Sequence, residues 1–158
     1  MTYTLIGYCI LIFFASVLVA KRLLVIVDVV GDSMLPTFKN GDRLMFCRST
    51  PLTNIRLDTI VIFKWGFSKE EGYSLKRVRG VPGQTVVMRT VDLNPVAADL
   101  HSGAYQDDSV AWHVPESHYF LVGDNTYRTE EKPIYSVDSV INGPVPRKSI
   151  FGTFLLKL

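Results

Sequence analysis

The chain has 158 residues, 47% of them hydrophobic and 20% charged, a composition that suits one compact domain plus an unusually apolar segment. Its net charge of +2 is too small and too dispersed to indicate a nucleic-acid partner. Cys9 lies in an apolar run and Cys47 follows "RLMF", so the two cysteines imply no disulfide framework. No residue spacing typical of a metal site appears, and no cofactor is implied.

An uncharged stretch from Tyr3 to Ala20 predicts one transmembrane helix. As a helix it would span roughly 27 Å, close to the thickness of the bilayer hydrocarbon core. A cleaved signal peptide is the alternative, but no basic region precedes the stretch and the apolar run exceeds the usual signal-peptide length. We therefore predict a membrane anchor over residues 1–22 and one β-rich domain over residues 23–158.

The residues beyond the anchor predict a mainly β domain of antiparallel strands without a helical half. "LLVIVDVV" follows Arg22 directly, and further short β-rich pieces are punctuated by Gly, Pro, Asn and Asp. Two polar segments, 94–109 and 125–136, predict long surface loops. The further strands are predicted over residues 43–46, 58–65, 73–81, 84–91, 118–122 and 150–158.

The first stretch with possible chemistry is "VVGDSMLPTFKNGD", residues 30–43, in which Ser33 lies between a strand and a turn. A serine there can present both its hydroxyl and its backbone N–H in a cleft, as a nucleophile requires. A serine before a Pro-containing turn is, however, far more often a local hydrogen-bonding residue.

The second stretch is "YSLKRVRGVPGQTV", where Lys76 shares a strand face with Ser74 and Val78, and Leu75 and Arg77 lie on the other face. A strand lysine usually extends to water. A desolvated ammonium would instead have a lowered pKa, and its neutral amine would be a general base at neutral pH.

The third stretch joins an apolar strand to Gly123, Asp124 and Asn125, and continues to Ser136, Asp138 and Ser139 before a Gly-Pro turn. By itself this pattern favours a polar loop capped by Asx turns.

In this order, the three stretches resemble the motifs of the type I signal peptidases, membrane-bound serine peptidases that remove leader sequences from exported proteins. "GDSMLPT" resembles the nucleophile motif of that family, "KRVRGVPG" the lysine motif, and "GDN" with "SVDSVINGPV" the closing motif. The resemblance runs from the apolar span to about Val145. It implies antiparallel coiled β-sheets behind one N-terminal transmembrane helix, and a Ser/Lys dyad in place of a metal or cofactor.

The resemblance also implies a role for individual residues. Ser33 would be the nucleophile and Lys76 the general base, while Ser136 would orient the lysine amine and Asp138 would support the closing loop. The backbone N–H of Ser33 would donate to the oxyanion; some members add a serine hydroxyl two residues earlier, where this chain has Gly31.

A leader segment would pair along "IVDVVG", residues 26–31, as an extended strand. Val29, Val30, Gly31 and Leu75 are the predicted substrate-binding residues, and the resemblance implies that the pockets accept small side chains of the Ala-x-Ala kind. The implied partners are leader-bearing precursor proteins and membrane lipid, and the sequence leaves the oligomeric state open.

Three features depart from the family pattern. Val140 stands where many relatives have an arginine that pairs with the residue corresponding to Asp138, and Arg77 is a candidate substitute. Residues 126–135 make the connection from Asn125 to Ser136 longer than usual. The segment between the lysine and closing motifs is short, as in compact bacterial and mitochondrial members.

Alternative functions remain at this stage. A dedicated maturation peptidase for one or few precursors and a non-catalytic membrane scaffold share the same sequence features. The self-cleaving repressors also use a Ser/Lys dyad, but they are soluble and lack the closing motif. A Ser-His-Asp hydrolase would need His101, His113 or His118 as its base, and these predict solvated loop histidines.

The charges beside the span and the implied peptidase function predict opposite sides of the membrane for the domain. Lys21 and Arg22 follow the span, so the positive-inside rule would leave the domain in the cytoplasm. Leader peptides are cut on the far side, and long domains translocate with limited regard to flanking charge. We predict a single-pass protein with its catalytic domain on the outer side, in a bacterial plasma membrane by preference or a mitochondrial inner membrane.

Overall fold

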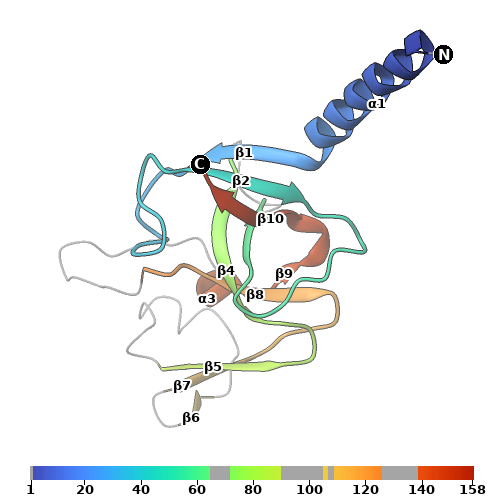
Figure 1. Ribbon diagram of the computed structural model, residues 1–158. Coiled ribbons are helices and arrows are strands. Elements are labelled where there is room, and N and C mark those ends of the chain that lie inside the picture. Colours follow the sequence, from blue (N-terminus) through green and yellow to red (C-terminus); the bar gives the residue numbers. More distant parts are fainter. Residues whose placement is uncertain (1, 65–71, 90–104, 107–108, 126–138) are drawn as a thin grey trace.

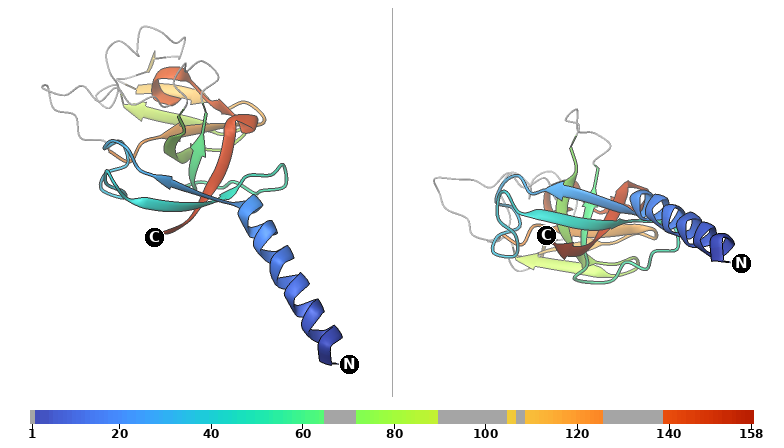
Figure 2. Two further views of the ribbon diagram at one scale, coloured as in Figure 1. Left: turned by 90° about the horizontal axis from the view of Figure 1, so that it is seen from above. Right: turned by 45° about the horizontal axis from the view of Figure 1, so that its top comes forward.

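The computed structural model describes residues 2–64, 72–89, 105–106, 109–125 and 139–158. One long helix, α1 (Thr2–Leu23), projects from a body of strands and leads directly into the first of them (Figures 1 and 2). Its segment Ile6–Leu23 is long and apolar enough to cross a membrane, and none of it is buried against the protein. The predicted apolar helix is therefore confirmed, and it continues past Lys21 and Arg22.

The β body contains a larger and a smaller sheet, and every strand pair in the described residues is antiparallel. The strand order is β1-β2-β10-β3-β4-β8-β9 in the larger sheet and β5-β7-β6 in the smaller one. The mainly β prediction is confirmed, because the only other helices in the described ranges are α3 (Ser139–Asn142) and the 3-10 turn η2 (Arg147–Ser149). The strands are β1 (Leu24–Asp28), β2 (Arg43–Arg48), β3 (Ile60–Phe63), β4 (Ser74–Gly80), β5 (Thr85–Arg89), β6 (Tyr105–Gln106), β7 (Ser109–His113), β8 (His118–Val122), β9 (Val145–Pro146) and β10 (Ile150–Lys157).

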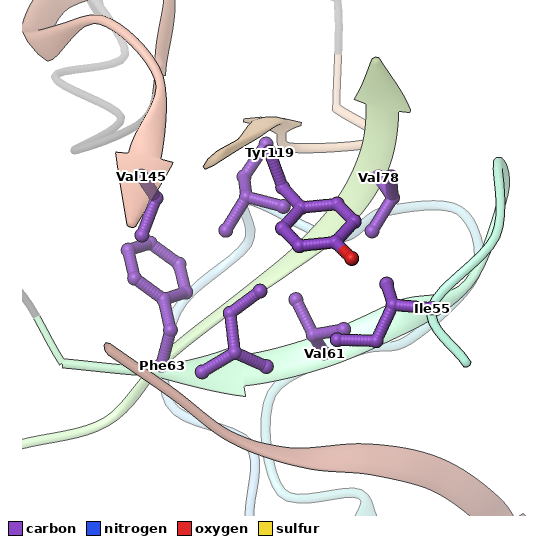
Figure 3. Close-up of a cluster of buried hydrophobic side chains, with 8 residues drawn as sticks. Ile55, Val61, Phe63, Val78, Tyr119 and Val145 are labelled. Atoms are coloured by element: carbon purple, nitrogen blue, oxygen red, sulfur yellow. The ribbon is translucent and has the colours of Figure 1, made fainter. Parts of the chain in front are cut away.

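Strands β3 and β4 separate two hydrophobic clusters. Val61 and Val78 face a cluster completed by residues of β8, β9 and β10, whose side chains face one another in Figure 3. Ile60 and Ile62 point to the opposite side, where residues of β2 and of the turn after β1 pack. The period-two alternation of buried side chains fixes this arrangement, because a slip of one residue would exchange the two faces.

Each strand predicted from local pattern is present, with bounds that differ by a few residues. The predicted loop 94–109 is wrong at its end, because residues 105, 106 and 109 belong to β6 and β7. The polar run "QDDS" suggested a loop, but β7 pairs with β5 along its whole length, a long-range contact that local composition does not reveal. Apart from Asn125, the predicted loop 125–136 lies outside the described residues.

Candidate active site

The turn that carries Ser33 spans residues 29–42 and is closed at its base by two backbone hydrogen bonds. Val29 N donates to Asp42 O at 2.8 Å, and Gly41 N donates to Val29 O at 2.9 Å. Inside the turn, Gly31 N donates to the Asn40 side-chain oxygen at 3.0 Å. These bonds hold a half-buried Ser33 within an ordered loop between β1 and β2. We call residues 29–42 the Ser33 turn.

Two apolar side chains anchor the Ser33 turn in the core. Met34 is 1% exposed and Phe38 is 5% exposed, and both pack in the cluster that includes Ile62. The residue that follows Ser33 is thus completely buried, and this limits the freedom of the serine backbone.

The Ser33 turn is fastened to the segment that follows β8. Asn125 N donates to the backbone oxygen of Ser33 at 3.0 Å, and the Asn125 side-chain amide donates to Asp32 O at 2.9 Å. The Thr37 hydroxyl donates to Asp124 Oδ2 at 2.6 Å. The nucleophile and closing motifs, about 90 residues apart in the chain, are therefore in direct contact.

Strand β4 joins the same network through Arg77. Its guanidinium donates to both carboxylate oxygens of Asp124, at 2.8 and 2.6 Å, and to the Thr37 hydroxyl at 3.3 Å. This bidentate pair is largely buried, since the side chains of Arg77 and Asp124 are 18% and 6% exposed. Arg77 was predicted as a possible partner of Asp138, which lies outside the described residues; within the described ones its carboxylate partner is Asp124.

The network determines the ionisation of Asp124. Burial by itself would raise the pKa of the Asp124 carboxyl, but the hydrogen bonds from Arg77 and Thr37 and the charges of Arg77 and Arg79 outweigh burial and hold the pKa below its ordinary value. The same pairing raises the pKa of Arg77. Asp124 is thus an anion whose charge holds the three motifs together.

Lys76 precedes Arg77 in β4 and lies opposite Val61 of β3. It is 3% exposed, one of only three buried polar residues among those described. The predicted faces of the strand are confirmed, because Leu75 packs in the cluster of the Ser33 turn and Val78 packs in the other cluster. Lys76 is thus largely removed from water.

The predicted substrate-binding residues differ in exposure. Val29 of the Ser33 turn is 7% exposed and belongs to the hydrophobic cluster against which Leu75 of β4 packs. Val30 is 91% exposed and Gly31 has a φ of +88°, with open space where a Cβ would be. The structure thus places Val29 and Leu75 in the same apolar region and leaves Val30 and Gly31 exposed.

The closing motif is described only in part. Ser136 and Asp138 lie outside the described residues. Ser139 is fully buried and accepts a hydrogen bond from Leu121 N at 2.8 Å, so it fastens α3 to β8. Val140, at the position where many relatives have an arginine, is 6% exposed and packs with Phe120 in a third hydrophobic cluster. Sequence reasoning singled out Val140 as a departure, and in this fold it is a core residue.

The described histidines do not form a catalytic arrangement. His113 ends β7 and His118 begins β8, so neither is a loop histidine; the strand predicted over residues 118–122 already included His118, whereas the strand position of His113 was missed. His118 Nδ1 lies 2.9 Å from Glu116 O, a backbone contact and not a carboxylate that would orient a base. In the described ranges, no three His, Cys, Asp or Glu residues are grouped as metal ligands. Thr37 and Asn40 are the site residues that sequence reasoning missed; their polar character beside Pro36 and Gly41 was the available signal.

Two sequence comparisons with known proteins identify one family. The sequence model described as "Signal peptidase, peptidase S26" matches residues 2–158. The chain is 32% identical over 141 residues to signal peptidase I V of Bacillus subtilis (strain 168). This alignment covers 77% of this chain and 78% of that protein. The chain is also 30% identical over 141 residues to the probable signal peptidase I-1 of Synechocystis sp. That alignment covers 80% of this chain and 67% of that protein. A crystal structure of a signal peptidase I from Enterococcus faecalis V583 superposes with a TM-score of 0.42 at 21% identity, over 66% of this chain and 99% of that chain.

Proposed function

Because this chain belongs to the signal peptidase family, peptidase S26, we propose that it removes leader peptides from exported precursors with Ser33 as nucleophile and Lys76 as general base. Its similarity to proteins named signal peptidase I supports a serine endopeptidase of that type. The observation that carries the proposal is the convergence of three distant motifs. Asn125 holds Ser33, and Asp124 joins the Ser33 turn to Arg77, the neighbour of Lys76.

In the proposed mechanism, the neutral amine of Lys76 accepts the Ser33 hydroxyl proton as the Ser33 oxygen attacks the scissile carbonyl. The same proton passes to the leaving amine when the peptide bond breaks, and an acyl-enzyme on Ser33 remains. A water molecule, activated by the same amine, then hydrolyses the ester. The burial of Lys76 supports this role, because desolvation favours the uncharged amine.

Stabilisation of the tetrahedral intermediate is assigned to the backbone N–H of Ser33. A donor of this kind is effective only when it is already fixed before the reaction. The bonds from Asn125 to Ser33 O and to Asp32 O, together with buried Met34, supply that rigidity.

The substrate is proposed to bind as an extended strand between the end of β1 and the beginning of β4. β1 is an edge strand, paired only with β2 in the described sheet. On β4, the last pair with β8 is Arg77 with Val122, so Ser74 and Leu75 extend beyond that strand. Open backbone edges add extended peptides by main-chain hydrogen bonding, and we expect the apolar cluster of Val29 and Leu75 to receive small side chains.

The family is membrane-associated, and we propose that the domain lies on the outer side of the membrane with one face of the larger sheet against the lipid. Ile26, Met45 and Leu156 are register neighbours across β1, β2 and β10 on the face opposite the core. Ile26 is 55% exposed and Leu156 is 42% exposed. An exposed apolar row on the strands that follow α1 suits a lipid interface. A bacterial plasma membrane is our preferred location, with the mitochondrial inner membrane as the alternative.

The test is cleavage of candidate precursors by the full detergent-solubilised chain, with the cut site located by mass spectrometry. We expect cleavage after a small residue, an acylating inhibitor attached to Ser33, and the loss of both in Ser33→Ala. Ser16→Ala is the control, because Ser16 lies on α1 and bonds only locally, to Phe13 O. Cleavage by Ser33→Ala at the normal rate would refute the mechanism. A chain that neither cleaves a precursor nor reacts at Ser33 would be a non-catalytic scaffold.

A further inference from the structure

A surface cavity of about 550 Å³ lies at the end of the larger sheet from which α1 departs. Leu24, the first residue of β1, pairs with Cys47, so Arg48 at the end of β2 lies beside the last residue of α1. Figure 1 shows β2 ending beneath the junction of α1 and β1. β10 begins and β3 ends at the same edge, where Lys64 N donates to Ser149 O at 3.0 Å. The cavity is therefore on the side of the domain nearest the anchor helix.

Three basic side chains line this cavity: Arg48, Lys64 and Lys148. No acidic side chain is among the lining residues in the described part of the chain. Some basic residues elsewhere are paired with carboxylates, as Arg77 is with Asp124 and Lys157 is with Asp42. Within the described ranges, none of the three cavity cations forms an ion pair, so the cavity concentrates positive charge.

Two of the cations lie over a pair of adjacent aromatic rings. The guanidinium of Arg48 lies 4.6 Å from the ring centroid of Phe151, and the ammonium of Lys64 lies 4.9 Å from that of Tyr73. The rings of Tyr73 and Phe151 are themselves 4.6 Å apart. Arg48, Phe151, Tyr73 and Lys64 therefore form one continuous row. The cation–π contacts in this row limit the conformations of both charged side chains before any anion binds.

The cavity wall is rigid on its other side. Ser49 N donates to Phe151 O at 2.8 Å, and Arg147 Nη1 donates to the Ser49 hydroxyl oxygen at 2.6 Å. The site is therefore built from the ends of paired strands and from bonded side chains, and its cations come from three separate segments.

We propose that this cavity binds the phosphate of an anionic phospholipid headgroup in the leaflet at which α1 ends. Two independent features point to lipid as the source of the phosphate. Lys21 and Arg22 lie in the last turn of α1, so the positive charge extends from the cavity to the end of the apolar span. Tyr73, 40% exposed, is an aromatic residue of the kind that concentrates at membrane interfaces. Basic side chains at the membrane interface are attracted to anionic lipid headgroups. This site is separate from the Ser33 turn, and the proposal does not depend on peptidase activity.

The test is lipid retention by the full chain, measured by native mass spectrometry from a neutral detergent with phosphatidylglycerol or phosphatidylcholine added. We expect phosphatidylglycerol to be retained in preference to phosphatidylcholine, and the preference to weaken as salt is raised. Lys64→Gln/Lys148→Gln should reduce retention about thirtyfold, since each basic residue near the membrane surface contributes about fivefold. Lys64→Arg/Lys148→Arg is the matched control, which keeps the charge and should keep the preference.

Further arms separate the possible sources of the anion. Arg56→Gln removes one exposed charge outside the cavity and should leave the preference intact, whereas Arg48→Gln should lower it. Inorganic phosphate should compete only weakly, because it lacks the glycerol and acyl portions held at the interface. Equal retention of the two lipids, or unchanged retention in the double Gln variant, would overturn the proposal. So would displacement by millimolar inorganic phosphate or by an acidic peptide alone, which would identify a site for soluble anions or for protein.

Discussion

Ser33 and Lys76 are positioned by different kinds of interaction. Ser33 lies in a connection between two strands, and polar bonds to residues 124 and 125 fasten that connection. Lys76 lies in β4, which has β3 on one side and β8 on the other. The comparison indicates that the place of the serine depends on the polar contacts of Asp124 and Asn125 with its turn, whereas the place of the lysine depends on the packing of the sheet. The predictions that follow separate these two dependences.

The largest effect is expected when either member of the dyad is removed. Ser33→Ala and Lys76→Ala should each lower the cleavage rate about 10⁴-fold or more, and the double variant should be no slower than either single variant. Each change abolishes the same proton transfer, so the losses cannot add. Initial rates on a defined precursor measure this, and additive losses would show that the two residues act separately.

Conservative replacements of Lys76 and Ser33 test the chemical role of each residue separately. Lys76→Arg should be as inactive as Lys76→Ala, because a guanidinium stays protonated and cannot accept the serine proton. Ser33→Cys should retain slight activity, since thiols are good nucleophiles. Near-normal turnover in Lys76→Arg would remove the lysine as the base and leave His113 and His118 as the described candidates.

The pH dependence of the wild-type chain should show the buried amine. Burial is expected to place the folded-state pKa of Lys76 below the free value of about 10.4, so activity should rise toward mildly alkaline pH. With the folded pKa lowered, the unfolded chain binds more protons between the two pKa values, and stability rises with pH there. Lys76→Met should lose this pH dependence of unfolding and be at least as stable at neutral pH. A flat wild-type profile over that range would contradict a desolvated lysine.

The next effect concerns the polar fastening of the Ser33 turn. Asp124→Ala leaves the guanidinium of Arg77 without its buried carboxylate and should lower the free energy of unfolding by about 2–3 kcal/mol. Activity should fall as well, because Thr37 also loses its acceptor. Urea unfolding and cleavage rates measure the two effects. Asp28→Ala is the matched control: it breaks the pair of Asp28 with Arg43, both of them exposed, and should change stability far less.

The Asp124 carboxylate should also make the stability of the fold depend on pH under acidic conditions. Because the folded-state pKa of Asp124 lies below the ordinary 3.8, the stabilisation is fully present above pH 3.8 and is lost as pH falls through the lower, folded value. Asp124→Asn should reduce the slope of unfolding free energy against pH in this range. An unchanged slope would show that other carboxylates, such as Asp42 with its lowered pKa, determine this pH dependence.

Much of the framework was predictable because it depends on local pattern. The apolar span and the alternating strands, including the opposite faces of Leu75 and Lys76, were predicted from neighbouring residues alone. The bonds of Asp124 to Thr37 and Arg77 were not, because they join positions 87 and 47 residues apart. β7 was missed for the same reason: its partner β5 is distant in the chain. The cationic cavity was also invisible in the sequence, since the strand order alone brings Arg48, Lys64 and Lys148 together.

The smallest effect concerns the backbone two residues before the nucleophile. Gly31 has a φ of +88° and open space around the position of a Cβ, so Gly31→Ala creates no clash and introduces only backbone strain. That strain should lower stability by about 1–2 kcal/mol and, by shifting the Ser33 N–H, should slow catalysis more than it weakens precursor binding. Gly72→Ala is the control, because Gly72 also has open space but no positive φ. Gly31→Ser adds the hydroxyl that some relatives have, yet it carries the same strain, so we expect it to be no faster than Gly31→Ala. A faster Gly31→Ser variant would show that the turn accommodates a side chain at this position. It would also show that the wild-type chain is slowed by the lack of a second oxyanion donor.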